Sequence, residues 1–273
     1  MKFLLSAAAL IAIASPALAH DMWVASPTFR VAEGQPAPVL LRVGHADETD
    51  AWNAPWERVH SFRSYGPAGV EDQQAALVIV PREGEPNATV RLKGAGTHIV
   101  ALESYHSTST LAADKFNEYL ETEGLDTAKA ARAQTGKTGA PGVELYSRRA
   151  KMLMQVGDTP SDNVLRPIGQ TLEIVPLTNP YARGTATALP VRVLFQGRPI
   201  GGVQVRILPL GVKNGAVQKI RSDADGRVSF DVPNRGKWLI MAVHARPMEG
   251  HPTAAFDTIF ASLTFGYGEG ARR

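Results

Sequence analysis

The fold class follows from residues 220–232, which read IRSDADGRVSFDV. The segment Asp223-Ala-Asp-Gly226 lies between two runs of alternating residues, and glycine can adopt the positive φ that a tight turn requires. The stretch therefore predicts a β-hairpin, with one strand before Asp223 and one after Gly226. Asn234-Arg-Gly236 predicts a second turn of this kind a few residues later.

Short strands separated by turns continue on both sides of this stretch. The alternating segments after about residue 170 are 172–177, 189–195, 203–208, 217–221, 227–232, 237–244 and 258–265. This number and spacing of strands predict an immunoglobulin-like or prealbumin-like β-sandwich. An earlier series, residues 59–65, 75–80, 88–92 and 97–105, follows a strand that ends at Gly44-His45. We expect a mainly β protein that contains two β-sandwich domains.

Between the two β-rich regions the hydrophobic period changes from two to about 3.6 residues. In a first predicted helix, which ends at Glu123-Gly124, one face contains Ala112, Phe116, Tyr119 and Leu120. In a last predicted helix, one face contains Tyr146, Ala150, Leu153 and Met154. The expected organisation is a signal peptide at 1–19, an N-terminal sandwich at 20–106, a helical insert at 107–160, a C-terminal sandwich at 161–267 and a tail at 268–273.

Residues 1–19 have the features of a cleavable signal peptide: Lys2, a short apolar run, and the small residues of Ala17-Leu-Ala19. Cleavage after Ala19 makes His20 the first residue of an exported, periplasmic chain. A free α-amine beside an imidazole can chelate a transition metal through two nitrogen atoms. The apolar run is too short to span a bilayer, so we do not expect the mature chain to span one.

Composition limits the chemistry. The 273 residues include no cysteine, which excludes disulfides, thiolate metal sites and cysteine nucleophiles. Any metal site must therefore use nitrogen and oxygen ligands. The net charge of +3 is small and its cations are interspersed with acids, so we do not expect nucleic acid as a partner.

Two more histidines follow rows of residues predicted to face inward. The rows are Val39, Leu41 and Val43 before His45, and Trp238, Ile240 and Ala242 before His244. We predict that His20, His45 and His244 are the ligands of one metal site at the rim of a sandwich. Each histidine could instead be a core-edge residue bonded to a backbone carbonyl. His98 and His106 also share a strand face, and their role stays open.

Seven motifs extend over nearly the whole mature chain. They are His20-Asp-x-Trp23, Leu41-Arg-Val-Gly-His45, Lys115-Phe-Asn-x-Tyr119-Leu-x-x-Glu123-Gly-Leu125, Tyr146-Ser-Arg-x-Ala-Lys151, Leu189-Pro-Val-Arg-Val-Leu-Phe195, Asp223-x-Asp-Gly-Arg227 and Ala261-Ser-Leu-Thr-Phe265. Together they resemble an uncharacterised bacterial periplasmic family, a domain of unknown function often labelled a nickel-uptake (cobalt/nickel transport) component. The resemblance implies a Gram-negative periplasmic protein, a C-terminal sandwich of the carboxypeptidase-regulatory-like type, and histidine at positions 20, 45 and 244.

We therefore expect a periplasmic protein that binds a divalent transition metal, and whether it is also an enzyme stays open. The resemblance implies nickel or cobalt, with a membrane transporter component as partner, whereas the affinity order of nitrogen ligands favours copper. Two alternatives stay open. In one, His20 and a second histidine form a histidine brace that holds copper in an oxidase or monooxygenase. In the other, the protein is a metal-free structural adaptor that docks a membrane transporter.

Overall fold

The computed structural model describes residues 21–46, 48–53 and 55–268. Nearly half of these residues lie in β-strands that form three sheets, and two α-helices lie beside them. The expectation of a mainly β, sandwich-type fold is confirmed. In the described part of the chain, no helix is long and apolar enough to cross a membrane.

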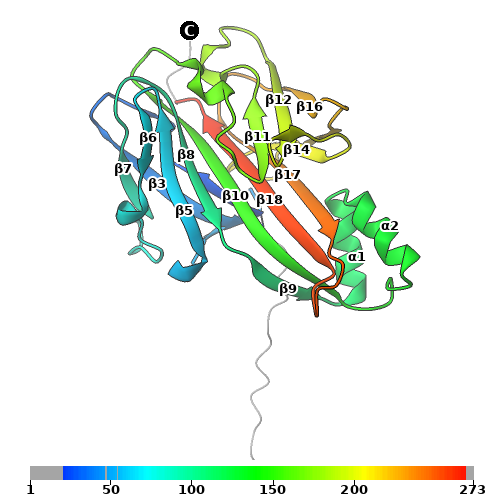
Figure 1. Cartoon of the computed structure of the whole chain (residues 1–273). Coiled ribbons are helices and arrows are strands. Elements are labelled where there is room, and N and C mark those ends of the chain that lie inside the picture. The colour runs from blue at the N-terminus through cyan, green and yellow to red at the C-terminus, as the bar shows by residue number, and fades with distance from the viewer. Residues whose placement is uncertain (1–20, 47, 54, 269–273) are drawn as a thin grey trace, which may run out of the picture.

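A ten-stranded central sheet takes its strands from both halves of the chain (Figure 1). Its order is β15 (Gln218–Arg221), β14 (Gln204–Pro209), β17 (Lys237–Pro247), β18 (Phe256–Gly266), β10 (Gly142–Val156), β8 (Gly96–Ser104), β5 (Val59–Gly66) and β6 (Gly69–Asp72). β2 (Arg30–Val31) and β9 (Ser107–Leu111) pair with opposite ends of β10. β10 and β18 run parallel to each other at the centre. The sheet therefore continues across the boundaries expected after residues 106 and 160.

A four-stranded sheet covers one face of the central sheet. Its strands are β1 (Asp21–Ala25), β3 (Pro36–Gly44), β4 (Thr49–Ala51) and β7 (Ala88–Arg91). Trp23 and Leu41 of this outer sheet are buried in the same core as Phe62 and Met152 of the central sheet. Burial of these large apolar side chains is the main contribution that holds the two layers together.

A second four-stranded sheet covers the other face. It contains β11 (Leu172–Pro176), β12 (Ala188–Phe195), β13 (Arg198–Pro199) and β16 (Arg227–Asp231). Val191 and Phe230 of this sheet share a core with Leu153 and Ile240 of the central sheet. The neighbours Met152 and Leu153 of β10 thus enter different cores, because successive side chains of a strand point to opposite faces.

Two helices cover the end of the central sheet that the first outer sheet leaves bare (Figure 1). They are α1 (Ala113–Thr122) and α2 (Asp126–Gln134), and short 3₁₀ turns occur at Trp56–Arg58, Gln74–Ala76, Asp162–Leu165 and Pro180–Ala182. Phe116, Tyr119 and Leu120 pack with Phe256 and Phe260 of β18. The predicted first helix is confirmed, and it ends before Gly124, whose φ of +66° suits a helix C-terminus.

Two local predictions in the second half of the chain are wrong. The segment that contains Tyr146 and Met154 is not a helix but part of strand β10, which is buried on both faces and so lacks the alternation that marks a half-exposed strand. The turns at Asp223–Gly226 and at 234–236 exist, but neither closes a hairpin. β15 pairs with β14, β16 with β12, and β17 with β14 and β18. Each turn instead carries the chain from one sheet to another.

Candidate functional site

The first described residue, Asp21, lies beside His45. β1 and β3 are antiparallel, and their register pairs Asp21 with Gly44. His45 follows Gly44 directly, is exposed, and lines a cavity of about 300 Å³. The other residues that line it are Asp21, Ala46, Arg206, Leu208, Pro209, Val212, Asn214, Gly215, Val217 and Lys219.

Arg206 holds Asp21 in place at this cavity. Its guanidinium bonds the Asp21 carboxylate at 2.5 Å and the Glu123 carboxylate at 3.0 Å, and each of the three side chains is at most 13% exposed. Burial by itself lowers the pKa of Arg206, but the two carboxylates outweigh burial and raise it. Burial also raises the pKa of Glu123 despite the neighbouring Arg206. The ion pairs therefore tie β1 and the end of α1 to β14.

A buried polar network extends from this point along β10. The guanidinium of Arg148 lies 5.3 Å from the Tyr146 ring centre, and that of Arg58 lies on the same ring at 5.3 Å and donates to the Tyr146 hydroxyl at 3.1 Å. Burial lowers the pKa of Arg148, while the nearby charge of Asp21 acts in the opposite direction. The network therefore places two cations and a phenol close to the described end of β1.

Glu144 belongs to the same face of β10 and is fully buried. Its Oε2 accepts hydrogen bonds from the Thr258 hydroxyl at 2.6 Å and, weakly, from the Tyr119 hydroxyl at 3.5 Å. Its Oε1 is buried with no hydrogen-bond partner among the described residues. Burial raises the pKa of Glu144 to about 7, so this carboxyl is about half protonated at neutral pH.

His244 points to the opposite face of the central sheet from His45. It shares a strand face with Ile240 and Ala242, which belong to the second core, whereas Met241 belongs to the first. Its ring lies 4.7 Å from that of Phe195, and burial lowers the pKa of the imidazole. The structure therefore does not bring His45 and His244 together. The prediction that both histidines follow buried rows is nevertheless correct.

His20, the third predicted ligand, lies outside the described residues. Among the residues that are described, no group of three or more His, Asp or Glu side chains could hold a metal ion. The donors that the described cavity offers are the His45 imidazole and the Asp21 carboxylate, and Arg206 already pairs with that carboxylate. This donor set fits a metal only in part, because transition-metal sites built from nitrogen and oxygen need at least one more strong ligand.

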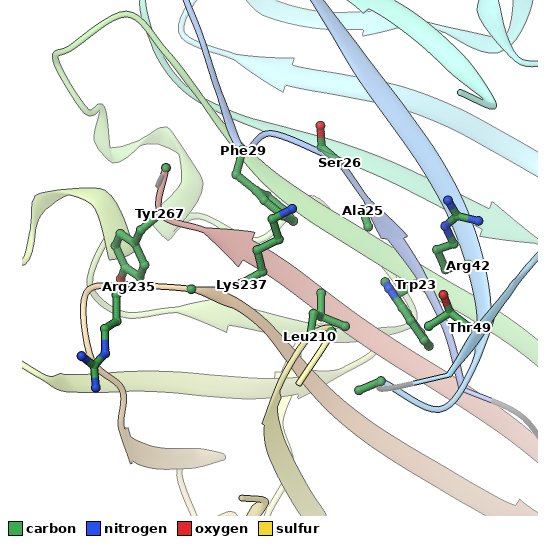
Figure 2. A pocket seen from close by; sticks show the side chains of 14 residues that line it. Trp23, Ala25, Ser26, Phe29, Arg42, Thr49, Leu210, Arg235, Lys237 and Tyr267 are labelled. Atoms are coloured by element: carbon green, nitrogen blue, oxygen red, sulfur yellow. The ribbon is translucent and has the colours of Figure 1, made fainter. Parts of the chain in front are cut away.

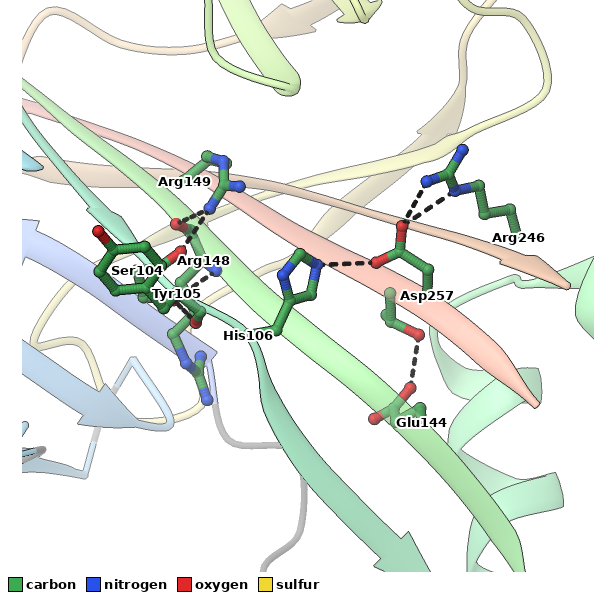
Figure 3. A network of polar contacts seen from close by, with 9 residues as sticks. Ser104, Tyr105, His106, Glu144, Arg148, Arg149, Arg246 and Asp257 are labelled. Atoms are coloured by element: carbon green, nitrogen blue, oxygen red, sulfur yellow. Dashed lines mark hydrogen bonds and ion pairs between the residues drawn. The ribbon is translucent and has the colours of Figure 1, made fainter. Parts of the chain in front are cut away.

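The other histidines make separate contacts. His98 is buried and its Nε2 bonds the Gly94 carbonyl at 2.9 Å, as the core-edge interpretation expects. His106 bonds Asp257 at 3.1 Å, and Arg246 bonds the other oxygen of that carboxylate (Figure 3). The ring of His60 packs edge-on against Tyr105, and His251 accepts from a backbone amide of its own turn. None of these four lines the cavity beside His45.

A cavity of about 960 Å³ was not predicted (Figure 2). It is lined by Trp23, Ala25, Ser26, Phe29, Arg42, Ala46, Thr49, Leu210, Gly211, Arg235, Gly236, Lys237, Tyr267 and Gly268. Ala46 lines both this cavity and the one beside His45, and its carbonyl accepts from the Gly211 amide at 2.9 Å. The lining residues come from distant segments, so no local motif marks them.

The fold and these cavities define a mainly β, sandwich-type protein with two adjoining cavities on one side. The profile of a family described as a domain of unknown function, DUF4198, matches residues 17–246. The chain belongs to this family. A search of curated proteins finds no match.

Two solved structures show weak similarity. Escherichia coli alpha-2-macroglobulin activated by porcine elastase is 12% identical, with a TM-score of 0.23 and coverage of 91% of this chain and 20% of that one. Dimeric latent PorU from Porphyromonas gingivalis is 11% identical, with a TM-score of 0.18 and coverage of 89% and 20%. The chain thus spans about a fifth of each, and similarity at this level carries no argument about fold or function.

Proposed function

We propose that this is an exported periplasmic protein that binds a divalent transition metal at its processed N-terminus. In this proposal the α-amine and ring of His20 and the ring of His45 are the ligands. The metal is nickel or cobalt according to the family resemblance, and copper according to ligand affinity. His244 is not included, because its side chain points to the opposite face of the central sheet.

The observation that carries the proposal is the pairing of Asp21 with Gly44. One peptide bond joins His20 to Asp21 and another joins Gly44 to His45, so covalent geometry keeps both residues close to this pair. The β1–β3 ladder and the Asp21–Arg206 ion pair make the anchor rigid. A rigid anchor lowers the entropy lost when two histidines from distant parts of the sequence bind one ion.

Calorimetry on correctly cleaved protein tests the proposal. Intact mass first confirms that the chain begins at His20, and Ni²⁺, Co²⁺ and Cu²⁺ are then titrated separately. We expect His45→Ala to weaken binding at least tenfold, about the loss that even an outer partner of a metal ligand causes. Binding should also weaken below about pH 6, where imidazole and amine take up protons.

His244→Ala is the matched control, since it removes the same ring from the other face and should leave the affinity unchanged. Extending the chain by one residue before His20 converts the α-amine of His20 into a peptide amide. This change should also weaken metal binding. Equal affinity of wild-type protein and His45→Ala would overturn the proposal, as would the absence of binding by correctly cleaved protein. A transporter component that receives the metal is the partner implied by the resemblance.

A further inference from the structure

The 960 Å³ cavity combines unpaired cations with apolar walls. Arg42, Arg235 and Lys237 line it, and no acidic residue does so in the described part of the chain. Lys237 donates to the Pro27 carbonyl at 2.8 Å. The guanidinium groups of Arg42 and Arg235 have no hydrogen bond or ion pair with any described residue. Two positive charges are therefore available to a ligand.

The positions of these cations suit an elongated molecule. Figure 2 shows Arg42 with Trp23 and Thr49 at one end of the cavity, Arg235 with Tyr267 at the other end, and Lys237 between them. Trp23 and Arg42 are cross-strand partners in the β1–β3 ladder, so their side chains lie on one face of that sheet. The strand pairing therefore places a cationic residue on the same sheet face as an aromatic one, which is a suitable site for a charged group attached to an apolar body.

The walls supply the apolar part. Trp23, Phe29, Leu210 and Tyr267 line the cavity, and three of these four are aromatic. Its volume lies at the upper end of the range of small-molecule sites, about 300–1,000 Å³. The indole N–H of the nearly buried Trp23 has no hydrogen-bond partner among the described residues and adds a donor to the arginine end.

We propose that this cavity binds a small organic anion, with its carboxylate or phosphate group at one of the two arginines, Arg42 or Arg235, and an aromatic or apolar body along the wall that includes Trp23, Phe29 and Tyr267. The site is independent of the proposed metal function, because no metal donor is needed. Its neighbour across Ala46 is the His45 cavity, so the two ligands would occupy adjoining sites on the same side of the molecule.

Calorimetry in the presence of a chelator tests this site apart from any metal. The probes are naphthalene-2-carboxylate, 1-naphthyl phosphate and the neutral naphthalene-2-carboxamide. We expect one or both anions to bind at least fivefold more tightly than the carboxamide, and to bind more weakly at high salt. Binding of only one anion identifies the head group. Equal binding of all three probes would overturn the proposal.

Substitutions locate the binding. Arg42→Gln or Arg235→Gln, whichever removes the arginine at the head group, is expected to weaken anion binding at least fivefold, and neither variant should change carboxamide binding. Arg198→Gln is the matched control: Arg198 is exposed, does not line the cavity, and its loss changes the net charge equally. Unchanged anion affinity in both cavity variants contradicts the proposed site. Equal affinity for acetate and naphthalene-2-carboxylate contradicts the role of the apolar walls.

Discussion

Glu144 is a carboxyl group that the fold buries without an ion pair to any residue that the structure describes. Its hydrogen-bond donors are two hydroxyl groups, those of Thr258 and Tyr119, which are neutral. Burial disfavours the ionised form and raises its pKa to about 7. The protonated form is therefore the one that suits this site, and ionisation at higher pH costs stability.

The resulting prediction concerns the pH dependence of stability. The pKa of Glu144 is higher in the folded chain than its ordinary value of 4.5 in the unfolded chain, so its contribution is fully present below pH 4.5 and is lost as the pH rises through 7. Relative to wild type, Glu144→Gln should gain about 2 kcal/mol between pH 5 and pH 8. Urea unfolding at both pH values measures this gain. The control is Glu57→Gln, at an exposed carboxylate, which should show no comparable gain. If the stability difference between Glu144→Gln and wild type were the same at both pH values, the prediction would be wrong.

Strand β10 and helix α1 meet at a position where only glycine fits. A Cβ atom added to Gly142 would lie 2.0 Å from the ring of Phe116, which is fully buried in the helix core. The ring therefore rests directly on the backbone of β10, and the helix lies closer to the sheet than any larger residue would allow.

Gly142→Ala should lower the free energy of unfolding by about 1–3 kcal/mol, because overpacking displaces the Phe116 ring or the strand. Chemical denaturation followed by circular dichroism measures the loss. Gly139→Ala is the control, since a Cβ there meets nothing within 4 Å, and its effect should stay within about 0.5 kcal/mol. Adding Phe116→Leu to Gly142→Ala should recover part of the loss, and simple addition of the two losses would show that the contact is unimportant.

At the scale of the whole molecule, one sheet serves two cores. β10 sends Met152 into the first core and Leu153 into the second, and its parallel partner β18 is buried along its whole length. Two sandwiches with separate sheets could unfold independently. Here both cores contain side chains of the same central sheet, so unfolding of one core would disrupt the sheet that also forms the other.

We therefore expect one cooperative unfolding transition. Phe62→Leu in the first core and Phe230→Leu in the second should each lower the same transition, by about 0.5–3 kcal/mol. Calorimetry and denaturant titration with two spectroscopic probes provide the measurement. Val70→Ala, at an exposed position of β6, is the control. Two transitions, each moved by only one of the phenylalanine substitutions, would show that the halves unfold separately.

Much of the secondary structure could be predicted from residue patterns. Alternation located β7 and β12, and the 3.6-residue period located α1, because one face of each of these elements is less buried than the other. β5 and β8 were also located, by apolar runs between turn residues, although their burial does not alternate. The rows predicted to face inward before His45 and His244 do contain buried side chains, those of Val39, Leu41, Ile240 and Ala242. The segment 75–80 failed, since it forms a 3₁₀ turn at Gln74–Ala76 and an isolated bridge at Leu77.

The sequence by itself determined where the chain turns and which side chains alternate, because these are properties of neighbouring residues. Only the tertiary structure decided which strands pair and which face each histidine occupies. The turn at Asp223–Gly226 forms as its residues require, yet the strands beside it join different sheets, since burial of the two cores selects their partners. For the same reason Arg42 and Arg235 meet at one cavity, and His244 lies on the opposite face from His45.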